Sequence, residues 1–221
     1  MTHDCIRQFA RMKRRIIVCF VGVDGSGKTT VATCLHESLV EEGISSKYLW
    51  AGWRGFESWL FKPLAAPTKH TMVKLGKERS VASAHDRMPF FDYLTWLDYF
   101  ARVYPALAAS LLTSTVTIVD RYVFDVIQGL HGGDTTSRRI VTRLLKLFPQ
   151  PTVVFYIRVP PEVAYARKDD IPSLEYLYRS DEEKQKLLKE LPADRVIVLD
   201  GARTVKELTH DAFKITTALV K

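Results

Sequence analysis

Short apolar runs rich in β-branched residues alternate along the chain with longer segments in which apolar residues recur every three or four positions. The short runs predict five strands, over Ile16–Val21, Ser46–Ala51, Val116–Val119, Thr152–Ile157 and Val196–Leu199. Most of these runs are continuously apolar, which is typical of parallel strands that helices cover on both faces.

The helical period is clearest directly after the first strand, where Val31, Leu35 and Leu39 recur. Further helices are expected over Phe90–Thr113, Phe124–Leu130, Ile140–Phe148, Pro160–Lys168, Leu174–Leu191 and Val205–Val220. Pro105 should kink or divide the first of these. Residues 57–89 contain two prolines and a polar, basic stretch, so we expect a mobile or partly disordered loop there.

This alternation indicates an α/β fold in three layers, with a five-stranded parallel sheet between two layers of helices. No repeat, low-complexity tract or linker interrupts residues 15–221, so we expect a single domain there. Residues 1–14 form a basic tail, which is either a solvated, partly frayed segment or an anion-binding arm.

The first predicted strand leads into a glycine-rich segment that fits G-x-x-x-x-G-K-[ST], the phosphate-binding P-loop. Its candidate ligand-binding residues are Gly22, Asp24, Gly25, Ser26, Gly27, Lys28, Thr29 and Thr30. Glycines let backbone N–H groups approach an anion closely, and the positive end of the following helix adds to the attraction. In this motif the lysine reaches the β- and γ-phosphates and the Thr29 hydroxyl holds Mg²⁺. The sequence therefore predicts a P-loop NTPase fold that binds a nucleoside triphosphate with Mg²⁺.

Composition limits the setting of this site. Lys and Arg number 32 against 25 Asp and Glu, a net charge of +7, which suits a phosphorylated substrate and also weak nucleic-acid binding. Cys5, Cys19 and Cys34 fit neither a zinc site nor a disulfide framework, so we expect a reducing compartment. Neither a secretory signal nor a bilayer-spanning run is evident, so we expect a cytoplasmic protein with no membrane partner.

Polar segments follow four of the predicted strands, at the edge where open parallel sheets bind ligands. They are Gly22–Thr30, Trp53-Arg54, Asp120-Arg121-Tyr122 and Asp200-Gly201-Ala202-Arg203. Asp120 matches the second acidic element of P-loop enzymes, whose carboxylate holds Mg²⁺ directly or through water. The alternative is an ordinary turn aspartate at a strand end.

Three motifs together resemble the thymidylate kinase family of P-loop nucleoside monophosphate kinases. They are Asp24–Thr30, Asp120-Arg121-Tyr122 and Val159-Pro160-Pro161-Glu162-Val163 followed by Arg167. The resemblance spans nearly the whole chain and implies ATP and Mg²⁺ as cofactors, with a helical lid at roughly 167–182. It also implies catalytic roles for Lys28, Asp120, Arg121 and Arg167, and Mg²⁺ binding by Thr29 and Asp120.

The resemblance further implies where the two substrates bind. Arg203 is expected beside the donor nucleotide with the P-loop because of its own position after the last predicted strand, and not because of the resemblance. The acceptor is expected to contact Asp24, Trp53, Arg54, Arg102, Arg121, Tyr122 and Asp125. Within that set Arg121 would bind the acceptor phosphate, and Trp53 either stacks on an acceptor ring or packs in the core.

The chain departs from the family pattern around the acceptor. The family's Arg-Glu-Pro-Gly-Gly-Thr segment after the second strand is replaced by Ala51–Phe56, which keeps one arginine, Arg54. The family's serine five positions after the strand-end aspartate is replaced by Asp125, which would disfavour an anion and favour a hydroxyl or an amine. On the preceding helix, Asp98 and Arg102 take the place of the family's Asp-Arg pair with a different spacing.

We therefore expect a nucleoside monophosphate kinase of nucleotide biosynthesis that transfers the γ-phosphoryl of Mg-ATP to dTMP or a related nucleotide. The alternatives are a P-loop kinase for another small acceptor, such as a sugar or nucleoside hydroxyl, or an ATP-dependent switch that binds nucleic acid. A homodimer through the aromatic helix at 90–104 is implied by the resemblance, while a nucleic-acid partner is not expected. The cations at 184–189 are expected on a solvated helix face.

Overall fold

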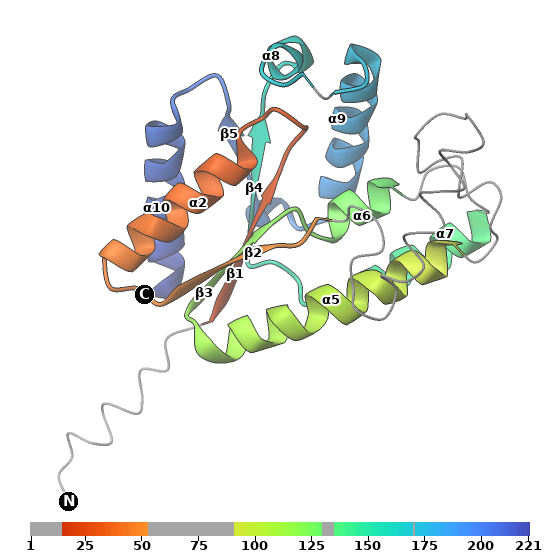
Figure 1. Ribbon diagram of the computed structural model, residues 1–221. Helices are drawn as coiled ribbons and strands as arrows, with labels where there is room; N and C mark the ends of the chain where they lie inside the picture. The colour runs from red at the N-terminus through yellow and green to blue at the C-terminus, as the bar shows by residue number, and fades with distance from the viewer. Residues whose placement is uncertain (1–14, 53–90, 130–134, 170) are drawn as a thin grey trace, which may run out of the picture.

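Five parallel strands form the centre of the computed structural model, which describes residues 15–52, 91–129, 135–169 and 171–221 (Figure 1). The strands are β1 (Ile16–Val21), β2 (Ser46–Trp50), β3 (Val116–Asp120), β4 (Val153–Arg158) and β5 (Val196–Asp200). They lie in the order β2-β3-β1-β4-β5, and every neighbouring pair is parallel. The α/β fold class predicted from the alternating pattern is confirmed. The tail over 1–14, the expected loop over 57–89, Trp53 and Arg54 lie outside the described residues.

Helices connect the strands and cover both faces of the sheet. They are α2 (Lys28–Glu41), α5 (Phe91–Thr113), α6 (Val123–Gly129), α7 (Thr135–Leu145), α8 (Pro161–Ala166), α9 (Leu174–Leu188) and α10 (Val205–Val220), with a short 3₁₀ turn η1 (Ala193–Arg195). None of the helices in the described ranges is both long and apolar enough to cross a bilayer.

Helices α5 and α7 differ from the expectation in two different ways. Helix α5 runs through Pro105 as one element, so the helix is not divided there. Pro105 is exposed, while Val103 and Leu107 on either side are buried and hold both halves of the helix against the sheet. Helix α7 begins five residues earlier than predicted, because its first turn is polar and carries no apolar period.

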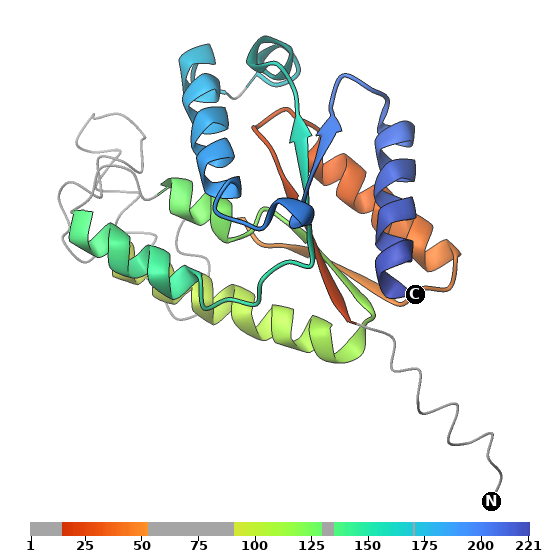
Figure 2. The same cartoon turned by 180° about the vertical axis from the view of Figure 1, so that it is seen from behind.

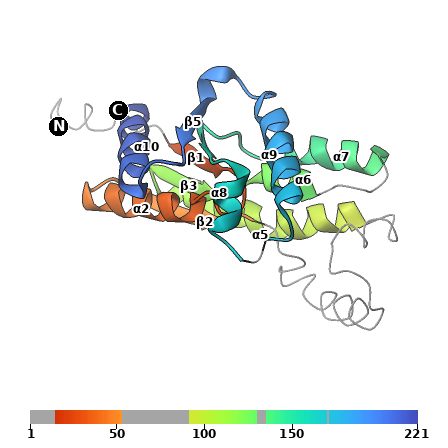
Figure 3. The ribbon, with the colours of Figure 1, turned by 90° about the horizontal axis from the view of Figure 1, so that it is seen from above.

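The side chains of β1 alternate between two separate cores. Val18 and Phe20 pack with α2 and α10 on one face of the sheet, whereas Cys19 and Val21 pack with α5, α6 and α7 on the other. Seen from behind and from above, α2 and α10 lie together on one side, with α5 and α7 on the opposite side (Figures 2 and 3). Cys19 is fully buried, and burial raises the pKa of its thiol.

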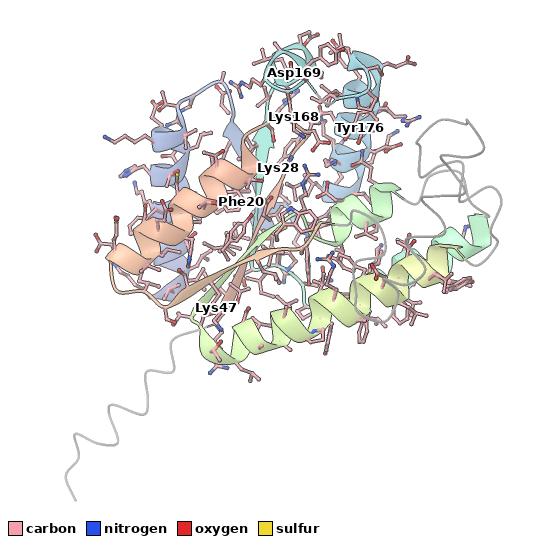
Figure 4. All side chains as sticks on the ribbon, in the orientation of Figure 1. Phe20, Lys28, Lys47, Lys168, Asp169 and Tyr176 are labelled. Carbon is pink, nitrogen blue, oxygen red and sulfur yellow. The ribbon has the colours of Figure 1, made fainter. Side chains whose placement is uncertain are left out.

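The register of the strands brings the ends of three of them level. Asp120 of β3 pairs with Phe20 of β1 and with Trp50 of β2. The loops that follow these strands therefore start at one edge of the sheet. Figure 4 shows Lys28 and Tyr176 at this edge and Lys47 at the opposite end of the sheet.

Candidate active site

The segment between β1 and α2 has the geometry of a phosphate-binding loop. Gly25 and Gly27 have φ angles of +82° and +88°, a left-handed conformation that costs other residues about 1–2 kcal/mol. A Cβ on Gly25 would lie 2.3 Å from the Ala164 carbonyl oxygen of α8, so the loop backbone packs directly against that helix. Gly27 offers no side chain to cap α2, and the first turn of α2 carries no acidic residue. The positive end of α2 is therefore left for an anion.

Lys28 is folded into the loop that it follows. Its side chain is buried, and its Nζ donates a hydrogen bond of 2.6 Å to the Val23 carbonyl oxygen. Burial, reinforced by the nearby Arg121 guanidinium, lowers the pKa of Lys28 to about 8, although Asp125 and Asp24 oppose the shift. A bound phosphate would supply the negative charge that this ammonium lacks.

Thr29 and Asp120 meet across the edge of the sheet, as the motifs predicted. Thr29 Oγ1 donates to Asp120 Oδ2 at 2.6 Å, and the Tyr48 hydroxyl of β2 donates to the same oxygen at 2.9 Å. Asp120 is fully buried, and its Oδ1 has no hydrogen-bond partner among the described residues. A buried carboxylate oxygen without a donor, beside a hydroxyl, fits a hard cation such as Mg²⁺. Tyr48 was missed because its position in β2 carries no motif.

Arg121 joins the P-loop to α6. Its Nη2 donates to Asp24 Oδ1, and its Nη1 lies 3.9 Å from Asp125 Oδ1. Burial raises the pKa of Asp24, but the charges of Arg121 and Lys28 outweigh it and hold the pKa at about 2. Arg121 also has a left-handed φ of 59°, unlike every other non-glycine residue in the described ranges. Such strain is concentrated at functional sites, where the surrounding structure maintains it.

Lys184 is buried, although the cations of α9 were expected on a solvated face. Only 3% of this residue is exposed, and its Nζ lies 3.3 Å from Asp125 Oδ1. The expectation holds for Lys186 and Lys189, which are exposed. It is wrong for Lys184, because this residue lies on the face of α9 that also buries Leu177, Ser180 and Leu188. Spacings of three, four and four residues along this face were the signal in the sequence.

Tyr176 of α9 is a second residue that sequence reasoning missed. It is partly buried, and burial together with the charges of Asp24 and Asp125 raises the pKa of its hydroxyl. Figure 4 shows Tyr176 at the same end of the sheet as Lys28. Tyr176, Ser180 and Lys184 recur every four residues, so they share one face of α9, and Lys184 on that face pairs with Asp125.

The remaining P-loop residues are placed around this cluster. Ser26 is buried, and its Oγ has no hydrogen-bond partner among the described residues. Gly22 lies beneath it, since a Cβ there would approach the Ser26 Oγ to 2.7 Å. Thr30 is exposed in the first turn of α2.

Four of the predicted site residues have other partners in this structure. The Tyr122 side chain is fully buried, and its hydroxyl donates to the Pro149 carbonyl oxygen, so it lies in the core rather than at the acceptor side. Arg102 donates to the Gly52 carbonyl oxygen and stacks over the Trp50 ring, at 5.5 Å from the centroid.

The other two arginines lie beyond β4 and β5. Arg167, at the end of α8, is exposed and donates to the Gly201 carbonyl oxygen at 3.3 Å. Arg203 donates to Asp211 of α10 at 2.7 Å. Arg203 had been expected beside the nucleotide from its position at a strand end, but local ion pairing on α10 determines where its guanidinium lies.

Known proteins resemble the chain along nearly its whole length, although no family model matches it. The chain is 26% identical to the thymidylate kinase of Leptospira interrogans, over 95% of this chain and 97% of that one. It is 23% identical to the probable thymidylate kinase of Archaeoglobus fulgidus, over 90% and 94%, and 27% identical to the probable thymidylate kinase 2 of Saccharolobus solfataricus, over 91% and 95%. The resemblance to thymidylate kinases is confirmed, at the identity of a divergent relative.

The two left-handed glycines provide a matched pair of substitutions. Gly27→Ala should lower the free energy of unfolding by about 1 kcal/mol, because alanine is strained at this left-handed φ. The added Cβ causes no clash, since nothing lies within 4 Å of it. Gly25→Ala should lower it by at least about 2 kcal/mol, because strain is joined by the clash with Ala164. Urea unfolding followed by circular dichroism measures both, and equal losses would contradict the packing of the loop on α8.

The Asp24–Arg121 pair should make the protein sensitive to acid. The pKa of Asp24 is lowered from 3.8 to about 2. The stabilising effect of the ionised carboxylate is therefore complete above about pH 5 and is lost as the pH falls through 3.8 towards 2. Asp24→Asn should lower the free energy of unfolding by about 1–2 kcal/mol at neutral pH, and about half of that difference should disappear by pH 3.

Urea unfolding of both proteins from pH 7 to pH 3 measures the effect. Asp194→Asn, which changes an exposed carboxylate in η1, is the matched control and should shift stability by less than about 0.5 kcal/mol. A difference between wild type and Asp24→Asn that stays constant with pH would show that the Asp24 pKa is not lowered.

Proposed function

We propose that this chain, a divergent relative of thymidylate kinases, is an ATP-dependent phosphotransferase that transfers the γ-phosphoryl group of Mg-ATP to a nucleoside monophosphate, with dTMP as the first candidate acceptor. One observation carries the proposal: Asp24, inside the P-loop, is paired with Arg121, which follows the buried Asp120. The donor loop and a cation suited to an acceptor phosphate therefore belong to one cluster. A second cation beside the P-loop suits an enzyme that binds two phosphorylated substrates.

The donor half binds the triphosphate. The backbone of the glycine loop and the positive end of α2 hold the phosphates, and Lys28 exchanges the Val23 carbonyl for a phosphate oxygen. That exchange gives the buried ammonium an anionic partner, so phosphate binding offsets the cost of burial that lowers the pKa of Lys28. Lys28 then stabilises negative charge on the transferring group.

Thr29 and Asp120 are the residues that would hold Mg²⁺. These two side chains supply two oxygen ligands, so water and phosphate oxygens would complete the coordination of the ion. When bound, Mg²⁺ neutralises phosphate charge during transfer. Tyr48 donates to Asp120 Oδ2, and Oδ1 is the oxygen that has no donor within the part of the chain that the structure describes.

The acceptor half orients the nucleophile. The planar guanidinium of Arg121 suits the phosphate of a monophosphate, and Asp24 fixes its direction. An acceptor phosphate oxygen forms the new bond to the γ-phosphorus while the bond to the ADP leaving oxygen breaks. This chemistry depends on position and charge, so no side chain has to act as a nucleophile. We place Arg167 at the start of a lid over 167–182, where it would leave the Gly201 carbonyl on closure.

Asp125 supports a second candidate function, a kinase for a sugar or nucleoside hydroxyl. Its carboxylate lies 3.9 Å from Arg121 and competes with an acceptor phosphate for that cation. The segment Ala51–Phe56, which replaces the usual arginine motif of the family, favours the same alternative. We place either activity in the cytoplasm, in one domain over 15–221.

A panel of acceptors tests the proposal. Purified protein with Mg-ATP should release ADP with dTMP faster than with thymidine, glucose or no acceptor. Lys28→Met should lower kcat by roughly 100-fold, because one preorganised cation at the transferring group is lost. Lys206→Met, on the exposed surface of α10, is the matched control and should leave kcat unchanged.

Each other outcome has a separate meaning. Turnover with a hydroxyl acceptor alone would replace the proposal with the second candidate. Hydrolysis stimulated only by polynucleotide would favour an ATP-dependent switch. Full activity of Lys28→Met would remove the P-loop from the mechanism.

We also propose a homodimer through α5. Its surface exposes Leu97, Phe100 and Tyr104, which are spaced along one helical face and are 41%, 37% and 40% exposed. Sedimentation of the wild type should give a dimer, and Phe100→Asp should give a monomer. Leu147→Asp, at an exposed residue beyond α7, should remain dimeric, and a monomeric wild type would contradict the proposal.

A further inference from the structure

Lys184 is a buried cation that none of the P-loop motifs explains. Its ammonium is surrounded by three acceptors: Gln128 Oε1, Ser180 Oγ at 3.1 Å and Asp125 Oδ1 at 3.3 Å. An ammonium has three protons to donate, so these partners saturate it. Lys184 therefore acts through its neighbours and not by reaching a substrate.

Its charged neighbour is the carboxylate that competes for Arg121. Asp125 Oδ1 faces both Lys184 and Arg121, while Oδ2 has no hydrogen-bond partner among the described residues. The charge of Asp125 is thus shared between two cations through one oxygen. The nearer one is Lys184, at 3.3 Å against 3.9 Å for Arg121.

The four side chains form a row of alternating charge that runs from the P-loop to α9. Asp24 pairs with Arg121, Arg121 lies beside Asp125, and Asp125 pairs with Lys184. The first pair is the more exposed, with 24% and 27% for Asp24 and Arg121 against 11% and 4% for Asp125 and Lys184. Water therefore screens the charges least at the α9 end of the row.

We propose that Lys184 and Asp125 are positioning residues that set how strongly Arg121 binds an anionic acceptor; the proposal rests on the role of Arg121 proposed above. Lys184 holds the Asp125 carboxylate nearer to α9 than to Arg121. The Arg121 guanidinium can therefore exchange this carboxylate for an acceptor phosphate. Without Lys184, Asp125 would pair fully with Arg121 and exclude the acceptor phosphate. Asp125 alone would disfavour a bound acceptor phosphate, and its pairing with Lys184 removes that effect.

A double-mutant cycle tests this coupling. Lys184→Met should raise KM for dTMP about tenfold, within the range measured for contacting residues, and leave KM for ATP within about twofold. Asp125→Asn removes the competing carboxylate, so Lys184→Met made in that background should change KM for dTMP by less than about twofold. Lys186→Met, on the exposed face of the same helix, is the matched control and should change neither constant.

The cycle separates positioning from a merely structural role. A loss of packing would change KM equally with and without Asp125, and it would affect both substrates, so either result would overturn the proposal. If Lys184→Met alone does not fold because Asp125 is left without its nearer cation, the comparison of Asp125→Asn with the double variant still measures the dependence.

A second measurement needs no acceptor at all. In protein labelled with ¹⁵N-arginine, the Nε–H signal of Arg121, assigned by its loss in Arg121→Lys, reports the environment of the guanidinium. Lys184→Met should shift this signal and Lys186→Met should not. An unchanged signal in Lys184→Met would overturn the positioning role. Failure of the wild type to phosphorylate any monophosphate, with the signal still shifted, would contradict the proposed function alone.

Discussion

The parallel pairing of β3 with β1, in register at Asp120 and Phe20, is the constraint on which the site depends. It brings the end of β3 beside the loop that leaves β1, so Asp120 reaches Thr29 and Arg121 reaches Asp24. A slip of one residue would turn every side chain of β3 to the opposite face. The apolar residues that alternate between the two cores prevent that slip, so packing of the cores also determines the geometry of the site.

The charges of the site are balanced unevenly, and the imbalance favours an anion. Asp24 gains more from its cations than burial costs it, because its pKa is lowered to about 2. Lys28 gains less from its nearby carboxylates than burial costs it, since burial and the charge of Arg121 lower its pKa to about 8. The protein therefore holds a cation that is incompletely compensated at the start of α2. Preorganised charge of this kind stabilises a transferring phosphoryl group without rearrangement at the moment of reaction.

The sequence predicted those parts that depend on local pattern. Strands and most helices follow from apolar periodicity, and Thr29 and Asp120 follow from motifs with fixed spacing. Lys184 was not predicted, because its burial depends on α9 packing against α6, far away in the sequence. Tyr122 was assigned to the acceptor from its place in a motif, whereas its ring fills the core and its hydroxyl reaches Pro149. Nor does periodicity show that Asp211 retains Arg203 on α10.

The burial of Lys184 against Asp125 has a consequence for the effect of ionic strength. Dissolved ions screen charges that face water but have little access to a pair that is 4% and 11% exposed. Added salt should therefore leave the Lys184–Asp125 pair almost unchanged. Effects of ionic strength would act instead on the more exposed Asp24–Arg121 pair and on the approach of anions, to which the chain presents a net charge of +7. In this fold salt should weaken the approach of anionic ligands far more than it weakens the buried pair of Lys184 and Asp125.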